Sequence, residues 1–143
     1  MKYSLGMLKP DCLGKNLSNN VLDMVKLSGL TIIASKTQRL ALNEICILYD
    51  RCRQKDFFKE MSAFLTSGDV LIFIVEGEDA INLLNETVGD TDPHKATKNT
   101  IRGRFGESIM KNICHSSMDY ESFKKEVKIF FTEKELKHLK IIT

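Results

Sequence analysis

The chain has 143 residues, of which 43% are hydrophobic and 28% are charged, and its formal net charge is +2. These proportions are typical of a single globular domain with one core, and they exclude a disordered chain. The small charge, with basic residues scattered along the chain, argues against a nucleic-acid-binding protein. No apolar run approaches the ~20 residues of a membrane-spanning helix, and Lys9 and Asp11 interrupt any signal peptide. We therefore expect one domain over residues 1–143 and no membrane segment.

The four cysteines form no C-x-x-C pair and show no zinc-like spacing; they are Cys12, Cys46, Cys52 and Cys114. A disulfide framework does not fit a chain with this much apolar residue to bury. We interpret the cysteines as reduced thiols and expect a cytoplasmic protein.

Local patterns predict the elements of the first part of the chain. Alternating apolar residues predict a strand over residues 2–8, which Lys9-Pro10-Asp11 ends because proline restricts the residue before it. Apolar side chains at helical spacing predict helices at 20–28, after Asn43, at 57–65 and at 78–87. Strands are expected at 30–36 and at 70–75, and the second is a continuous apolar run typical of a central strand covered on both faces.

The last part of the chain contains a long polar segment. Residues 89–117 break any periodic pattern and predict a functional loop. Residues 120–126 indicate a helix, 127–131 a last strand and 133–139 a terminal helix. The whole order predicts an α+β ferredoxin-like sandwich, with a four-stranded sheet of mixed, mainly antiparallel directions and helices packed on one face.

The 89–117 loop concentrates side chains that suit phosphate chemistry: Thr91, Thr100, Arg102, Arg104, Asn112, His115 and Ser117. Arginine donates two parallel hydrogen bonds to phosphate, and Lys9, at the end of the first strand, would add a charge. His115 suits a nucleophile because imidazole is partly unprotonated at neutral pH. Glu121 would hold its second nitrogen, and Ser117 would hold Glu121, by the logic of a catalytic triad.

Each of these residues also has an ordinary structural explanation. A loop histidine is more often structural, loop arginines are more often solvated, and Tyr49 and Phe57 have the spacing of core or anchor residues. The residues alone therefore indicate a phosphate site in the loop without specifying its reaction.

Seven segments in register resemble the nucleoside diphosphate kinase family, from about residue 3 to residue 131: Met7-Leu-Lys9-Pro10-Asp11, Phe57-Phe58-Lys-Glu, Thr66-Ser67-Gly68, Glu76-Gly77, Gly89-Asp-Thr91-Asp-Pro93, Thr100-Ile-Arg102-Gly103 and Asn112-Ile-Cys-His115. The resemblance implies a ping-pong phosphotransferase that maintains NTP and dNTP pools. His115 would take the γ-phosphate of a nucleoside triphosphate as phosphohistidine and give it to a nucleoside diphosphate. Mg²⁺ would arrive on the nucleotide phosphates, with no metal site made by the protein.

The resemblance also implies residue roles. Lys9, Thr91 and Arg102 would hold the phosphates, and Tyr49 would support Lys9 and the surroundings of the nucleophile. Asn112, with Lys9, would bind the sugar hydroxyls, while Phe57 and Ile109 would enclose the base. Glu121 and Ser117 would orient His115. Family members assemble as homo-oligomers, so a tetramer or hexamer is expected.

Several positions depart from the family pattern. Ser116 and Met118 replace a usual Gly and Asp after the histidine, and Asn85 stands where the family often has Arg, which weakens one phosphate contact. Arg104 stands where Asp is common and would return positive charge, and Asp56 replaces a frequent Pro. The changes at Asn85, Ser116 and Met118 leave open a catalytically weak nucleotide-binding module of the family. An RNA-binding ferredoxin-like module is a second alternative, from another functional class. The second lacks the aromatics that such modules carry on adjacent central strands, since the central run offers only Phe73.

Overall fold

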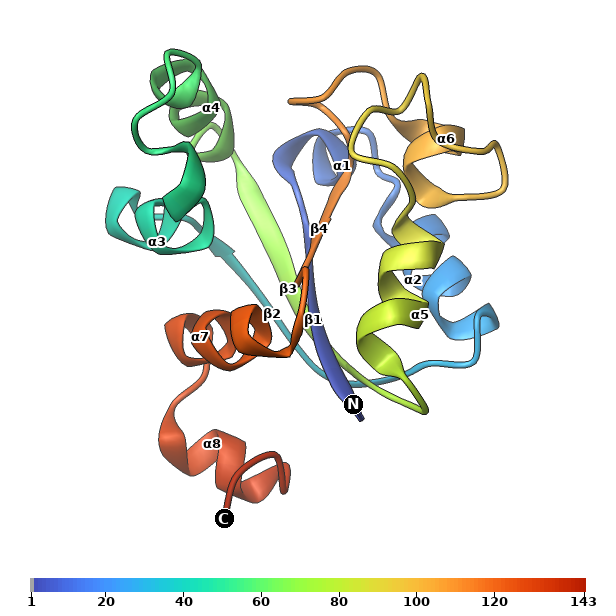
Figure 1. Ribbon diagram of the computed structural model, residues 1–143, viewed down its shortest axis with the longest axis vertical. Helices are drawn as coiled ribbons and strands as arrows, with labels where there is room; N and C mark the ends of the chain where they lie inside the picture. The colour runs from blue at the N-terminus through green and yellow to red at the C-terminus, as the bar shows by residue number, and fades with distance from the viewer. Residues whose placement is uncertain (1) are drawn as a thin grey trace.

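The structure is a computed structural model that describes residues 2–143 (Figure 1). Its sheet has the strand order β2-β3-β1-β4, with every neighbouring pair antiparallel. The strands are β1 (Tyr3–Leu8), β2 (Thr31–Arg39), β3 (Asp69–Glu76) and β4 (Cys114–Ser116). The expected antiparallel sheet and the central position of the 70–75 run are therefore confirmed.

Helices lie between and after these strands. They are α1 (Pro10–Gly14), α2 (Ser18–Leu27), α3 (Leu42–Leu48), the 3-10 turn η1 (Asp50–Cys52), α4 (Phe58–Leu65), α5 (Ala80–Val88), α6 (Ile101–Phe105), α7 (Tyr120–Phe130) and α8 (Glu133–His138). The two short helices α1 and α6 lie where none was predicted, and the others lie at the predicted places. Among the residues that the structure describes, no helix is both long and apolar enough to cross a membrane.

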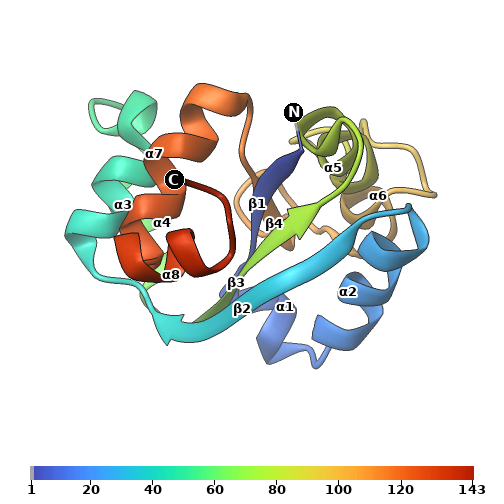
Figure 2. The same cartoon turned by 90° about the horizontal axis from the view of Figure 1, so that it is seen from below.

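Helices cover both faces of the sheet, so the expectation of helices on one face is wrong (Figures 1 and 2). Successive residues of a strand point to opposite faces. Ile72 and Ile74 of β3 pack with buried residues of α3, α4, α7 and α8, whereas Phe73 and Val75 pack against α2 and α5. The continuous apolar run of β3 is the sequence signature of this double cover.

Gly6 of β1 lies opposite Phe73 of β3 in the antiparallel register. A Cβ atom at position 6 would overlap the Phe73 ring, so glycine makes room for the ring in this core. Phe73 is fully buried. It therefore offers no stacking surface to RNA, which removes the aromatic on which an RNA-binding module would depend.

The predicted last strand over residues 127–131 is wrong, because α7 continues to Phe130. Phe123, Val127 and Phe130 recur at helical spacing and are all buried on the sheet-facing side. The fourth strand is instead β4, inside the segment predicted as loop, where it pairs with Gly6 to Leu8 of β1. A strand of three residues has too little pattern to be recognised in a sequence.

Candidate active site

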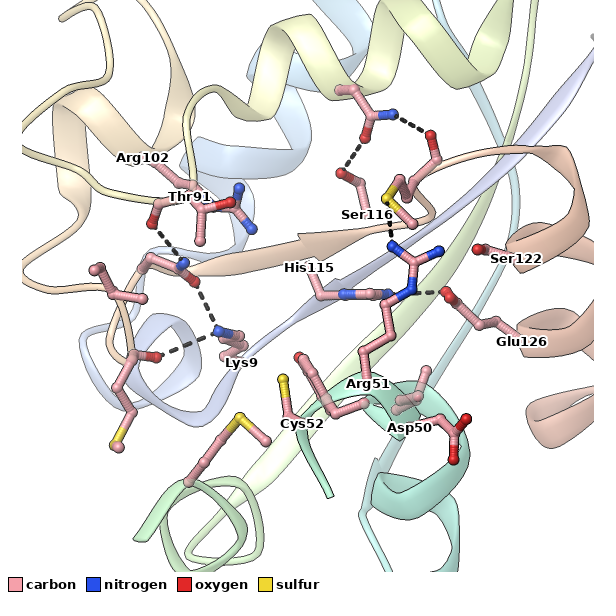
Figure 3. A pocket seen from close by; sticks show the side chains of 18 of the residues that line it. Lys9, Asp50, Arg51, Cys52, Thr91, Arg102, His115, Ser116, Ser122 and Glu126 are labelled. Atoms are coloured by element: carbon pink, nitrogen blue, oxygen red, sulfur yellow. Dashed lines mark hydrogen bonds and ion pairs between the residues drawn. The ribbon is translucent and has the colours of Figure 1, made fainter. Parts of the chain in front are cut away.

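A pocket of about 1040 Å³ opens above the β1 and β4 ends of the sheet, between the α3–η1–α4 segment and the 89–112 segment (Figure 3). Eight of the predicted site residues line it: Lys9, Tyr49, Phe57, Thr91, Arg102, Ile109, Asn112 and His115. Ser117 is buried, and neither Ser117 nor Glu121 is among the lining residues. The fold therefore gathers side chains from across the whole sequence into one cavity.

His115 is held by a buried carboxylate. It lies on β4 opposite Met7, and its Nε2 is 2.8 Å from Oε1 of Glu126 on α7. The Ser117 hydroxyl donates to the same Oε1 at 2.9 Å. The Glu126 side chain is 7% exposed and that of His115 14%. If Nε2 carries the proton shared with Glu126, Nδ1 is left with its lone pair free for a ligand in the pocket.

The prediction that Glu121 holds His115 is wrong, and so is its contact with Ser117. The Glu121 side chain is 82% exposed and pairs with Lys124 at 2.9 Å. Glu126 lies five residues further along α7, which turns it by roughly 140° around the helix axis. The sequence contains a signal for the role of Glu126, because this carboxylate interrupts the apolar stripe of Phe123, Val127 and Phe130. A carboxylate at such a position is buried and needs a partner.

Cys114 immediately precedes the histidine in β4. It is fully buried, and burial raises the pKa of its thiol to about 11. The thiol is therefore neutral at physiological pH and is not a nucleophile. All four cysteines are free, as expected for reduced thiols.

Lys9 is a buried ammonium group at the N-cap of α1. Its Nζ donates to Oδ1 of Asn112 at 2.7 Å and to the Met110 carbonyl at 3.3 Å. Asn112 in turn donates through Nδ2 to the Thr91 carbonyl at 2.9 Å, so it ties Lys9 to the loop at residue 91. Burial, and then the charge of Arg102, lower the pKa of Lys9 to about 8. An anionic ligand would relieve this cost.

Arg102 of α6 is fixed by two backbone carbonyls. Its Nη1 donates to Gly89 at 3.0 Å and its Nη2 to Cys114 at 2.7 Å. The Thr100 hydroxyl accepts from the Gly103 amide at 3.1 Å and caps the helix that carries this arginine. The Arg102 guanidinium therefore stands at a set position in the pocket wall.

Two donors of the pocket residues are buried without a hydrogen-bond partner among residues 2–143: Nε of Arg102 and the hydroxyl of Tyr49. Tyr49 also packs edge-on against His115, with ring centroids 5.4 Å apart and an interplanar angle of 61°. Buried donors are normally satisfied, so these atoms suggest a missing acceptor. A phosphate oxygen has that character.

Phe57 and Ile109 are large apolar side chains at the pocket that remain 47% and 60% exposed. Exposed apolar groups at a cavity indicate a ligand surface more than a core. Their placement suits a planar, sequence-tolerant group such as a nucleobase.

Three of the residues that depart from the family pattern, Asn85, Ser116 and Met118, contact one another. Ser116 Oγ donates to Oδ1 of Asn85 at 2.6 Å, and Nδ2 of Asn85 donates to the carbonyls of Ser117 at 3.1 Å and Met118 at 3.3 Å. Met118 is half exposed and accepts a contact from Nη1 of Arg51 at 3.2 Å. Arg104 does not line the pocket, so the expectation that it returns charge there gains no support.

Known proteins resemble the chain over nearly its whole length. The family model described as nucleoside diphosphate kinase matches residues 2–136. The nucleoside diphosphate kinase of Nitratiruptor is 35% identical over 95% of this chain and 99% of the relative, and that of Neorickettsia sennetsu is 38% identical over 95% and 98%.

Solved structures give the same result. The apo nucleoside diphosphate kinase of Encephalitozoon cuniculi superimposes with a TM-score of 0.91 at 31% identity, covering 94% of this chain and 92% of that one. A halophilic nucleoside diphosphate kinase from Halobacterium salinarum, solved in complex with CDP, gives 0.89 at 29% identity over 94% and 90%. Fold and relatives together define a phosphotransferase that acts on nucleotides. The chain belongs to the nucleoside diphosphate kinase family, and its activity is phosphate transfer between nucleoside triphosphates and diphosphates.

Proposed function

We propose that the transfer runs through a phosphate on Nδ1 of His115, in a ping-pong reaction that uses one pocket twice. The supporting observation is the Glu126–His115 contact at 2.8 Å, which occupies Nε2 and leaves Nδ1 unshared. The Nδ1 lone pair attacks the γ-phosphorus, the bond to the bridging oxygen breaks, and its electron pair leaves on the diphosphate. A terminal oxygen of a second diphosphate then attacks the phosphohistidine and restores His115. The positive charge that forms on the ring is stabilised by Glu126.

The phosphates would be held by donors that are already in position. Lys9, Arg102 and Tyr49 point charge or hydroxyl groups into the pocket from fixed places, and Thr91 adds a neutral donor. Preorganised donors lower the cost of charge developing in the transition state, and they serve both half-reactions. Asn112 would bind sugar hydroxyls together with Lys9, and Phe57 and Ile109 would enclose the base.

Mg²⁺ is proposed as the cofactor, carried by the nucleotide. Among residues 2–143, no group of three or more His, Cys, Asp or Glu side chains is arranged to hold a metal ion. Mg²⁺ commonly keeps several waters and binds through substrate phosphates, so the nucleotide phosphates would be its ligands. When bound, the ion would neutralise phosphate charge.

Labelling of the enzyme tests the proposal directly. Incubation with γ-labelled ATP and Mg²⁺ is expected to give acid-labile, base-stable label, which GDP removes as GTP. His115→Ala is expected to take up no label while unfolding at the same temperature as the unmodified protein. Full exchange activity in His115→Ala would contradict the proposal. Nucleotide binding without label in the unmodified protein would instead favour a catalytically weak module, the alternative that Asn85, Ser116 and Met118 motivated.

Three broader expectations belong to the same proposal: a homo-oligomeric tetramer or hexamer, a cytoplasmic location and a role in maintaining NTP and dNTP pools. Light scattering on the purified protein measures the first. A monomer that retains full exchange activity would remove the oligomer from the mechanism.

A further inference from the structure

The basic side chains of the pocket differ in how strongly they are already hydrogen-bonded to the protein. The pocket is lined by Lys9, Arg51, Arg102 and Lys125. Lys9 donates to Asn112 and a carbonyl, and both Nη atoms of Arg102 donate to carbonyls. Asn85 is similarly engaged, because its amide oxygen and nitrogen bind Ser116 and two carbonyls. These groups form a fixed wall.

Arg51 is different. It belongs to η1, and the hydrogen-bond acceptor of its guanidinium within residues 2–143 is the Met118 thioether sulfur, 3.2 Å from Nη1. A thioether is a weak acceptor. In the described part of the chain no carboxylate lies within 4.0 Å of Arg51, and its neighbour Asp50 pairs with Arg53. Hydrogen bonds from Ser122 are the main cause that lowers the pKa of Asp119, and the charge of Arg51 is the last of its causes. A full positive charge with five donors is therefore held at the pocket by a contact of little strength.

Arg51 also stands on a different side of the nucleophile from Lys9 and Arg102. Figure 3 shows Lys9 and Arg102 on one side of His115, and Arg51 with Ser116 on the other. In-line attack requires the transferring phosphorus to come within about 3–3.5 Å of the histidine nitrogen. A terminal phosphate at that position would lie between the two sets of cations, while the inner phosphates would remain nearer the Lys9 side.

We propose that Arg51 binds the terminal phosphate of the nucleoside triphosphate, exchanging its contact with Met118 for charge-assisted hydrogen bonds to the transferring group. The proposal rests on the proposed function only in placing that phosphate beside His115. It assigns to η1 a binding role that no pattern in its sequence predicts. It also gives the pocket a guanidinium on the side where Asn85 has no donor to spare. Arg51 is then a selector of triphosphate over diphosphate.

Equilibrium binding of two nucleotides to three variants tests this inference. The ligands are ADP and the non-hydrolysable β,γ-imido analogue of ATP, each with Mg²⁺, measured by titration calorimetry. Arg51→Ala is expected to weaken binding of the analogue by about tenfold, the effect of one charge-assisted hydrogen bond, and of ADP by less than about threefold. Arg51→Lys should recover part of the loss by keeping the charge.

Arg53→Ala is the matched control, because Arg53 is two residues away, pairs with Asp50 and does not line the pocket. It should leave both affinities unchanged. Equal affinity for the analogue in Arg51→Ala and Arg53→Ala would overturn the inference, as would equal losses for ADP and the analogue in Arg51→Ala. Because binding needs no phosphate transfer, a protein that binds but takes up no label would refute the proposed function and still decide the role of Arg51. A protein that binds neither nucleotide would refute both.

Discussion

Glu126 is a carboxylate on the apolar side of α7, where its neighbours Phe123, Val127 and Phe130 fill the core. An unpaired charge at such a depth would cost several kcal/mol, so its contacts with His115 and Ser117 are what make the position tenable. In the proposed reaction, the contact of Glu126 with Nε2 leaves Nδ1 to face the substrate. At the residue scale, one buried carboxylate thus serves both the fold and the chemistry.

Glu126→Gln is expected to slow phosphoenzyme formation by roughly 10²–10⁴-fold, because an amide neither stabilises the charged ring nor enforces the tautomer. Quenched-flow labelling with γ-labelled ATP measures the rate. Glu121→Gln, on the same helix but exposed, should change it by less than about twofold. Equal effects of the two substitutions would contradict the assignment of Glu126.

Lys9 should make the protein less stable below its own pKa. Its pKa is lowered from 10.5 to about 8 by burial and then by Arg102. Below pH 8 Lys9 is protonated in both the folded and the unfolded chain, and the folded chain bears the full free-energy cost of the buried charge. Between pH 8 and 10.5 only the unfolded chain holds the proton, so this cost to stability disappears as the pH rises.

Lys9→Met is therefore expected to raise the free energy of unfolding by about 1–3 kcal/mol at pH 7. This gain in the free energy of unfolding should shrink between pH 8 and 10.5. The Lys9→Met variant should also lose exchange activity. Urea denaturation at a series of pH values measures the difference between the two proteins. A gain that stays constant over this range would show that the charge of Lys9 is not its origin.

At the scale of elements, the hydrogen bonds of Asn85 join α5 to the end of β4. Ser116 and Asn85 are 31 residues apart and share a hydrogen bond of 2.6 Å, and Asn85 also holds the carbonyls that follow β4. The chain turns there from β4, which carries His115, into α7, which carries Glu126. Ser116 and Asn85, two of the departures from the family pattern, therefore tie the end of β4 to α5 beside the turn into α7.

Ser116→Ala is expected to lower the free energy of unfolding by about 1 kcal/mol, the usual net contribution of one hydrogen bond. In a double-mutant cycle with Asn85→Ala, the coupling energy should also be about 1 kcal/mol, because each variant removes the same bond. Chemical denaturation provides the values. Asn82→Ala, an exposed change on the same helix, should not couple to Ser116; additive effects of Ser116 and Asn85 would refute the pairing.

At the scale of the whole molecule, two cores lie on opposite faces of the sheet, and the pocket opens where segments from both sides converge (Figures 1 and 2). Lys9 comes from the β1–α1 junction, Tyr49 from the α3–η1 junction, Arg102 from α6 and Glu126 from α7. A ligand in this pocket touches segments from all parts of the chain, so its binding opposes global unfolding rather than one local opening.

Nucleotide is therefore expected to stabilise the entire fold. At a concentration of about 100 times its dissociation constant, ADP should add about 2.7 kcal/mol to the free energy of unfolding and raise Tm by roughly 5–10 °C. GDP and CDP should give similar shifts at the same saturation, because the proposed contacts of Phe57 and Ile109 are with the faces of the base. Differential scanning calorimetry measures the shifts. A shift with ADP alone would contradict base-tolerant enclosure.

The sequence by itself determined most of the elements, the antiparallel sheet and eight of the residues that line the pocket. Periodic burial is written into runs such as β3, and the family motifs keep the phosphate-binding residues in register. These signals are local or repeated, so they are visible without a structure.

Only the tertiary structure decided the fourth strand, the partner of His115 and the hydrogen-bond partners of the pocket cations. β4 exists because β1 offers it an edge, and Glu126 meets His115 because α7 packs with one particular face on the sheet. The sequence placed a carboxylate nearby in Glu121, but helix rotation turned that residue to solvent. Contacts between residues far apart in the chain depend on which faces pack together, and that is settled only when the whole core forms.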